Sequence, residues 1–139
     1  MKTKSIAALS LLLCAFVAMP ASAGKPDRNP SEKDCDFVGL GTACSDELQA
    51  AYDLVGSLLS QDPAVFLSRN PDKDAGTLQC KLSGAEIKYA TDKTGEAQWL
   101  VQDALDKILV LLNQGKLSED GYALIKASFD AAQECVGTP

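Results

Sequence analysis

The sequence predicts an all-α protein: an antiparallel four-helix bundle with a short additional helix near residues 63–69, held together by two disulfides. Four segments repeat apolar residues at steps of three and four, which is the spacing of one face of a helix. No segment alternates apolar and polar residues over a useful length, so no sheet is expected. Amphipathic helices joined by short connections bury their apolar faces best as an antiparallel bundle.

The first long helix is predicted over residues 45–60. Ser45 is a candidate N-cap, and Asp46 and Glu47 follow it in the first turn, where the helix dipole favours negative charge. One face of this segment is apolar at helical spacing and is expected to meet the core: Leu48, Ala51, Tyr52, Val55, Leu58 and Leu59.

The segment between the first and second long helices contains two proline signals. Asp62-Pro63 predicts the short helix near 63–69, because proline is favoured at the first helical position. The composition of residues 70–76 (Asn-Pro-Asp-Lys-Asp-Ala-Gly) predicts a loop. A second long helix is predicted over 77–91, with the capping-box pattern of residues 83–86 (Ser-Gly-Ala-Glu) as the alternative, later start. Its apolar stripe is Leu78, Leu82, Ala85 and Tyr89.

The third and fourth long helices occupy the rest of the chain. Thr94 is the candidate N-cap of a helix over 95–113, and Gly115 is placed to end it. Ser118, followed by two acidic residues, is the candidate N-cap of the last helix. The third helix presents Ala97, Leu100, Val101, Ala104, Leu105, Ile108, Leu111 and Leu112, and the fourth presents Tyr122, Ile125, Phe129, Ala132 and Val136.

The first 23 residues have the pattern of a secretory signal peptide of bacterial character. Lys2 and Lys4 precede an apolar stretch of 13 residues that is too short to span a bilayer comfortably, and small residues at 21–23 supply a cleavage site. We therefore expect export across the inner membrane to the periplasm or the exterior, with no membrane insertion after the signal is removed. Residues 24–36 are expected to be a flexible lead-in, and 37–139 a single helical domain.

Charge and composition exclude several functional classes. The chain carries 13 basic and 19 acidic residues and no histidine. Removal of Lys2 and Lys4 with the signal would leave 11 basic residues and a net charge of −8. An acidic chain without a Lys/Arg cluster is not expected to bind nucleic acid or anionic lipid. The missing histidine excludes Ser-His-Asp triads, Cys-His pairs and His-containing zinc sites, and no cofactor is predicted.

Four cysteines remain after the signal, and an oxidising compartment favours two disulfides. In an up-down bundle, Cys44 at the start of the first helix and Cys135 at the end of the last lie at the same end. Cys35 precedes Cys44 by nine residues, an extended reach of roughly 30 Å, so it can run along the bundle to Cys80. We favour Cys44–Cys135 with Cys35–Cys80. The alternative is Cys35–Cys44 with Cys80–Cys135.

The C-terminal 60 or so residues resemble a known helical module. Residues 78–86 (Leu-Gln-Cys-Lys-Leu-Ser-Gly-Ala-Glu) precede a second helix carrying Ala97, Leu100 and Leu105, then residues 113–118 (Asn-Gln-Gly-Lys-Leu-Ser) and an Ala-rich helix. This order resembles the FIMAH-type helical module of bacterial extracellular proteins, although the namesake histidine of that family is absent. The resemblance implies a non-catalytic extracellular unit for interaction, assigns no active-site residue and does not cover residues 24–75.

Acidic pairs are candidates for glycosidase or calcium chemistry. Asp103 and Asp106 share one side of the third helix, and Asp72 and Asp74 share the predicted loop. With 19 acidic residues, such pairs are expected by chance, and solvated faces and helix caps explain them. The loop also departs from an EF-hand, because Lys81 occupies the place of the twelfth-position glutamate. We predict no catalytic residue and no metal site.

Trp99 is the most informative single residue. At 100° per residue it lies nearly opposite the apolar stripe of its helix, together with Asp103, Asp106 and Val110. One explanation is that the segment carrying Phe37, Val38 and Leu40 folds over Trp99. The other is that Trp99 is an exposed aromatic anchor for a partner. These four α-helical positions, 99, 103, 106 and 110, are therefore the candidate binding site.

Together these features predict a small secreted or periplasmic protein that binds another protein or a surface polymer and is not an enzyme. Two alternatives remain open. The chain is an inhibitor or immunity-type protein against a secreted toxin or hydrolase, or it carries a small hydrophobic ligand inside the bundle.

Overall fold

A computed structural model describes residues 35–139 of the chain. The predicted signal peptide (1–23) and all but the last two residues of the predicted lead-in (24–36) lie outside the described residues.

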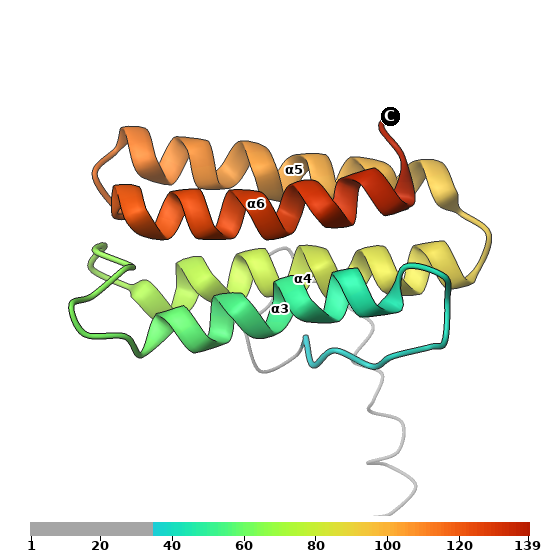
Figure 1. The fold of residues 1–139 in the computed structure, drawn as a ribbon, viewed down its shortest axis with the longest axis horizontal. Coiled ribbons are helices and arrows are strands. Elements are labelled where there is room, and N and C mark those ends of the chain that lie inside the picture. Colours follow the sequence, from blue (N-terminus) through green and yellow to red (C-terminus); the bar gives the residue numbers. More distant parts are fainter. Residues whose placement is uncertain (1–34) are drawn as a thin grey trace, which may run out of the picture.

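The described chain folds into four long helices that run alternately up and down. They are α3 (Ser45–Leu59), α4 (Pro71–Ala90), α5 (Thr94–Asn113) and α6 (Glu119–Val136). Figure 1 shows α5 and α6 lying over α3 and α4, and each helix packs against its chain neighbours while α6 closes the ring on α3. The predicted all-α antiparallel four-helix bundle is confirmed. No helix among residues 35–139 is long and apolar enough to cross a membrane.

The apolar stripes of the four helices form one core. Eight of its side chains, two from each helix, have no solvent-exposed surface: Leu48, Val55, Leu78, Leu82, Val101, Ile108, Ile125 and Phe129. Each of these belongs to a stripe predicted from helical spacing, so burial of apolar surface, at about 25 cal/mol per Å², favours this arrangement of faces. The side chains on the outward face of α5 are correspondingly left in solvent.

The predicted short helix near 63–69 is wrong. Residues 61–70 contain no helix, and Phe66 instead forms an isolated antiparallel bridge with Leu117. Leu67 N donates to Lys116 O at 2.9 Å, and Ser118 N donates to Val65 O at 3.0 Å. Val65 and Phe66 are buried. Burial of these side chains and pairing with the α5–α6 connection outweigh the local Asp-Pro helix signal.

The predicted loop over 70–76 is also wrong, because α4 begins at Pro71 rather than at 77. Asn70 lies at the N-cap position, proline follows at the first helical position, and Asp72 and Asp74 occupy the first turn. This is the helix-start pattern that the sequence analysis assigned to Asp62-Pro63. Ala75 and Gly76 are buried, so the extra turns contribute to the core.

Helix termini follow the predictions only in part. Ser118 caps α6 as predicted, with its hydroxyl accepting from Gly121 N at 3.0 Å. Gly115 follows the end of α5 in the left-handed region, with φ of +72°. Ser45 and Thr94 are instead the first residues of α3 and α5, and neither helix has a side-chain cap. The Ser45 hydroxyl bonds to another helix.

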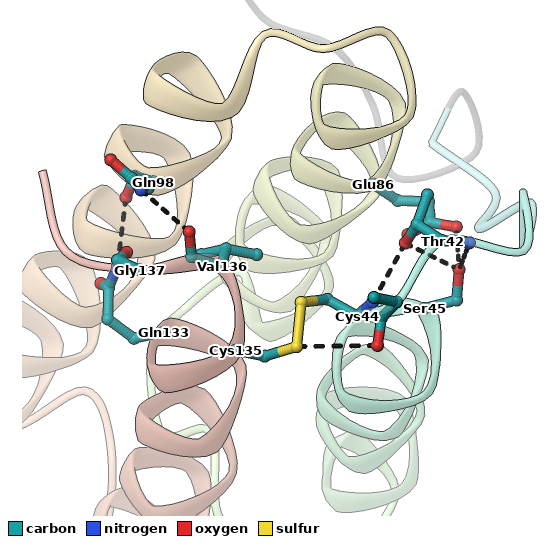
Figure 2. The surroundings of a disulfide bond; sticks show 10 residues. Thr42, Cys44, Ser45, Glu86, Gln98, Gln133, Cys135, Val136 and Gly137 are labelled. Carbon is teal, nitrogen blue, oxygen red and sulfur yellow. Dashed lines mark hydrogen bonds between the residues drawn. A yellow bond between two sulfur atoms is a disulfide. The ribbon is translucent and has the colours of Figure 1, made fainter.

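Both predicted disulfides are present, Cys35–Cys80 and Cys44–Cys135. Cys44–Cys135 joins the start of α3 to the end of α6 (Figure 2), as the up-down topology requires. Cys80 lies in the middle of α4, because that helix starts six residues earlier than predicted. Residues 35–44 run along α3 and α4 in Figure 1 to reach it. Two such bonds are typical of proteins of an oxidising, non-cytoplasmic compartment.

Candidate functional site

The four predicted site residues lie together on the outward face of α5. Trp99, Asp103, Asp106 and Val110 are spaced by four, three and four residues, which places them within about three turns of one helix face. All four are exposed, Trp99 to 59% and Val110 to 45%. The opposite face of α5 supplies the core residues of the helix. The structure therefore brings the predicted set together as one exposed strip.

The segment predicted as an alternative cover for Trp99 lies elsewhere, so that interpretation is wrong. Phe37 packs against Tyr52 of α3, with the two ring centroids 5.5 Å apart. Val38 is itself exposed, and Leu40 N donates to Glu86 of α4 at 2.7 Å. The Cys35–Cys80 bond fixes the beginning of this segment on α4. Because residues 37–40 contact α3 and α4, they do not cover Trp99 on the outward face of α5.

The carboxylates of the strip are not neutralised by cations. Asp106 accepts a hydrogen bond from Gln102 Nε2 at 3.1 Å. Within residues 35–139 neither Asp103 nor Asp106 forms a salt bridge, and the two ion pairs there are Lys88–Glu96 and Lys126–Asp130. The strip therefore combines one large aromatic surface with two negative charges.

The acidic pairs considered for catalysis or calcium binding do not form an enclosed site. Asp103 and Asp106 point into solvent, and Asp72 and Asp74 belong to the first turn of α4 rather than to a loop. A helical backbone cannot wrap successive oxygen ligands around an ion as a calcium loop does. No group of three or more candidate metal ligands occurs in residues 35–139.

A buried carboxylate that was not predicted from the sequence lies on α4. Glu86 is only 1% exposed. It accepts from Leu40 N at 2.7 Å, from Thr42 Oγ1 at 3.1 Å and from the Ser45 hydroxyl, as Figure 2 shows in part. Glu86 follows Leu78 and Leu82 at the same four-residue step, so it occupies a position on the apolar face of the helix. A charged residue at such a position was the sequence signal that could have indicated a buried carboxylate. Its oxygens are occupied by chain donors, which makes Glu86 the clamp that holds residues 40–45 on α4.

The phenol of Tyr52 supports the same segment. Its hydroxyl donates to Cys35 O at 2.8 Å, and Ser83 of α4 donates to Asp36 O at 3.2 Å. Burial, followed by the nearby Asp36 carboxylate, raises the pKa of the Tyr52 phenol above its ordinary value of 10.0.

A glutamine latch joins the start of α5 to the end of α6. Gln98 Nε2 donates to Val136 O at 2.9 Å, and Gln133 Nε2 donates back to Gln98 O at 3.5 Å and to Gly137 O of its own helix end at 2.6 Å (Figure 2). Gly137 has a φ of +97°, in the region that favours glycine. The latch includes the residue next to Trp99, so the backbone that carries the exposed indole is fixed to a neighbouring helix.

A polar pocket lies at the opposite end of the bundle from the latch, and sequence reasoning did not find it. Its volume is about 750 Å³, and its walls come from the α3–α4 connection, the first turn of α4, the end of α5 and the α5–α6 connection. Basic residues far apart in the sequence meet there, although no Lys/Arg cluster is visible along the chain: Arg69, Lys73, Lys107 and Lys116.

No protein-family model, no curated protein and no solved structure matches the chain.

Proposed function

We propose that the chain is a small, exported, non-catalytic protein that binds another protein or a surface polymer through the outward face of α5. The observation that carries this proposal is the 59% exposure of Trp99 on a helix whose other face is well buried. Tryptophan is enriched at binding hot spots because it brings a large contact area with few rotatable bonds.

The position of Trp99 suits an anchor. The indole stands on a regular helix, and the glutamine latch and the Cys44–Cys135 bond hold the end of α6 beside it. A side chain presented by a rigid element loses little freedom when it binds, so more of the contact energy appears as affinity. The proposed partner surface has a cleft or flat patch that accepts an indole.

The charge of the strip narrows the chemistry of the partner. Asp103 and Asp106 lie on the same face as the indole and have no cationic partner in the part of the chain that the structure describes. A partner that places lysine or arginine side chains near an apolar pocket would meet both the carboxylates and the ring face. For a surface polymer, amino or hydroxyl groups beside an apolar ring face would serve the same purpose.

Export rests on two observations of different kinds. Residues 1–23 have the sequence pattern of a secretory signal, and the folded part has two disulfides. The resemblance of residues 76–136 to the FIMAH-type module fits an extracellular interaction role and stays a prediction.

The two alternative functions gain no specific support. A carrier of a hydrophobic ligand needs an apolar cavity inside the bundle, whereas the pocket described above is lined by charged and polar residues at one end. An inhibitor or immunity-type protein would be a special case of protein binding, and no contact in residues 35–139 singles out a hydrolase or a toxin as the target.

The experiment compares two variants that remove exposed apolar side chains of similar exposure. Trp99→Ala is tested against Leu124→Ala on α6, where Leu124 is 53% exposed. Both proteins, with disulfides intact, are immobilised and exposed to the exported proteins and isolated envelope polymers of the producing cell. We expect Trp99→Ala to lose a ligand that Leu124→Ala retains, with both melting temperatures close to that of the unchanged protein. Equal binding by the two variants, or unfolding of Trp99→Ala alone, would overturn the proposal.

A further inference from the structure

The polar pocket at the end of the bundle gathers positive charge in an acidic protein. Arg69 lies two residues before α4, and Lys73 lies in the first turn of that helix. Lys107 comes from α5, and Lys116 comes from the α5–α6 connection. Asp74 is the one carboxylate among the lining residues. The pocket thus concentrates four cations in a chain whose formal net charge is −6.

The backbone holds these cations together. The α3–α4 and α5–α6 connections lie at the same end of the bundle (Figure 1), where Leu67 N donates to Lys116 O at 2.9 Å. Lys116 N in turn donates to Leu111 O at 2.8 Å, which ties the second connection to the end of α5. The bridge between Phe66 and Leu117 buries both side chains, so the walls of the pocket are part of the core structure.

The four cations have no carboxylate partners of their own. Within residues 35–139 none of them forms a salt bridge, and the lysines that do are Lys88 and Lys126. Like charges that share one hollow repel each other, and an anion placed between them removes this repulsion. Ser68 also lines the pocket, and its hydroxyl oxygen has no hydrogen-bond partner in the described part of the chain.

We propose that this pocket binds a small oxyanion with several negative charges, such as a compound that carries two or more phosphate or carboxylate groups. A guanidinium binds such groups through two parallel hydrogen bonds, and ammonium groups add point charges. The volume of about 750 Å³ is in the usual range of small-molecule sites.

The size of the pocket and the charge of the whole chain favour a small soluble anion over a polymer or a membrane. An extended polyanion or an anionic bilayer would also be repelled by the net negative charge of a chain with 19 acidic and 13 basic residues. The pocket shares no lining residue with the strip that carries Trp99, so it would serve a ligand other than the proposed partner.

The test is calorimetric titration of the disulfide-intact chain at low salt with pyrophosphate, tripolyphosphate, citrate and monovalent acetate. We expect binding that tightens with the number of charges and weakens with added salt. Lys73→Gln and Lys116→Gln should each weaken tripolyphosphate binding about three- to tenfold, as expected for the loss of one charged contact worth about 1 kcal/mol. Arg69→Lys should weaken it less than Arg69→Gln, because the charge remains.

Lys88→Gln is the matched control. It changes the net charge by the same amount, but Lys88 lies 15 residues along α4 from Lys73, which is about 22 Å of helix. Equal weakening of tripolyphosphate binding by Lys88→Gln would show that only the overall charge matters, and it would overturn the proposal that this pocket is the binding site. No binding of any multivalent anion at millimolar concentration, or binding only to vesicles of anionic lipid, would also overturn it. The four basic side chains are outside the core, so melting curves should show every variant folded.

Discussion

Replacement of Glu86 tests how the segment over residues 40–45 is held. Glu86→Ala removes a carboxylate that is 1% exposed and accepts from Leu40 N, Thr42 Oγ1 and the Ser45 hydroxyl. A hydrogen bond to a charged group contributes about 1.5–3 kcal/mol, and the three bonds share one acceptor group and are not additive. We therefore expect the free energy of unfolding to fall by about 3–4 kcal/mol. Glu86→Gln retains the shape and one acceptor oxygen, so its cost should be about half of this.

The assay is urea unfolding followed by circular dichroism, combined with amide hydrogen exchange. The midpoint should fall while the slope against urea stays unchanged, and exchange at the Leu40 amide should become faster. Glu96→Gln is the control, because Glu96 is exposed and only pairs with Lys88 at the surface; its unfolding curve should stay near that of the unchanged protein. If Glu86→Ala unfolds at the same urea concentration as Glu96→Gln, the clamp does not hold the segment and the reasoning fails.

Two further changes probe the packing around this framework. Tyr52→Phe removes the hydrogen bond to Cys35 O and should lower the free energy of unfolding by about 1 kcal/mol. Folding raises the pKa of this phenol, so its protonated form stabilises the fold fully below about pH 10, and this stabilisation is lost as the pH rises through the raised pKa. The unfolding free energy of Tyr52→Phe should therefore lack this loss at alkaline pH. Identical alkaline unfolding curves for the two proteins would contradict the assignment. Gly121→Ala would place a methyl group against Val65 Cγ1 and should lower the free energy of unfolding by about 1–3 kcal/mol, measured by thermal unfolding. Gly95→Ala is the control, because the space around Gly95 is open and the change should cost little. Equal melting temperatures for the two variants would refute the close approach of α6 to Val65.

The fold was predictable from the sequence because helical spacing and chain connectivity carry most of the information. The apolar stripes that include Leu48, Val101 and Phe129 became the core. The up-down order of the helices favoured the Cys44–Cys135 and Cys35–Cys80 pairing, which the structure has, over the alternative pairing. The outward position of Trp99 followed from the same periodicity.

The errors occurred where contacts between distant segments decide the local structure. Asp62-Pro63 and Asn70-Pro71 both have a helix-start pattern, and only burial of Val65 and Phe66 against Leu117 shows which one starts a helix. The Ser-Gly-Ala-Glu pattern resembles a capping box, but its glutamate bonds to residues more than 40 positions earlier. The basic pocket is assembled from positions 69 to 116, so no local pattern reveals it.

The most direct test of binding through the α5 face is photo-crosslinking inside the producing cell. A photoreactive amino acid replaces Gly95, an exposed residue of α5 about one turn before Trp99 with open space around it, and in a second protein it replaces Ala127, an exposed residue of α6. Our account predicts a discrete crosslinked species from position 95 that disappears when Trp99→Ala is added and does not form from position 127. The absence of a species at position 95, or the same species from both positions, would contradict it.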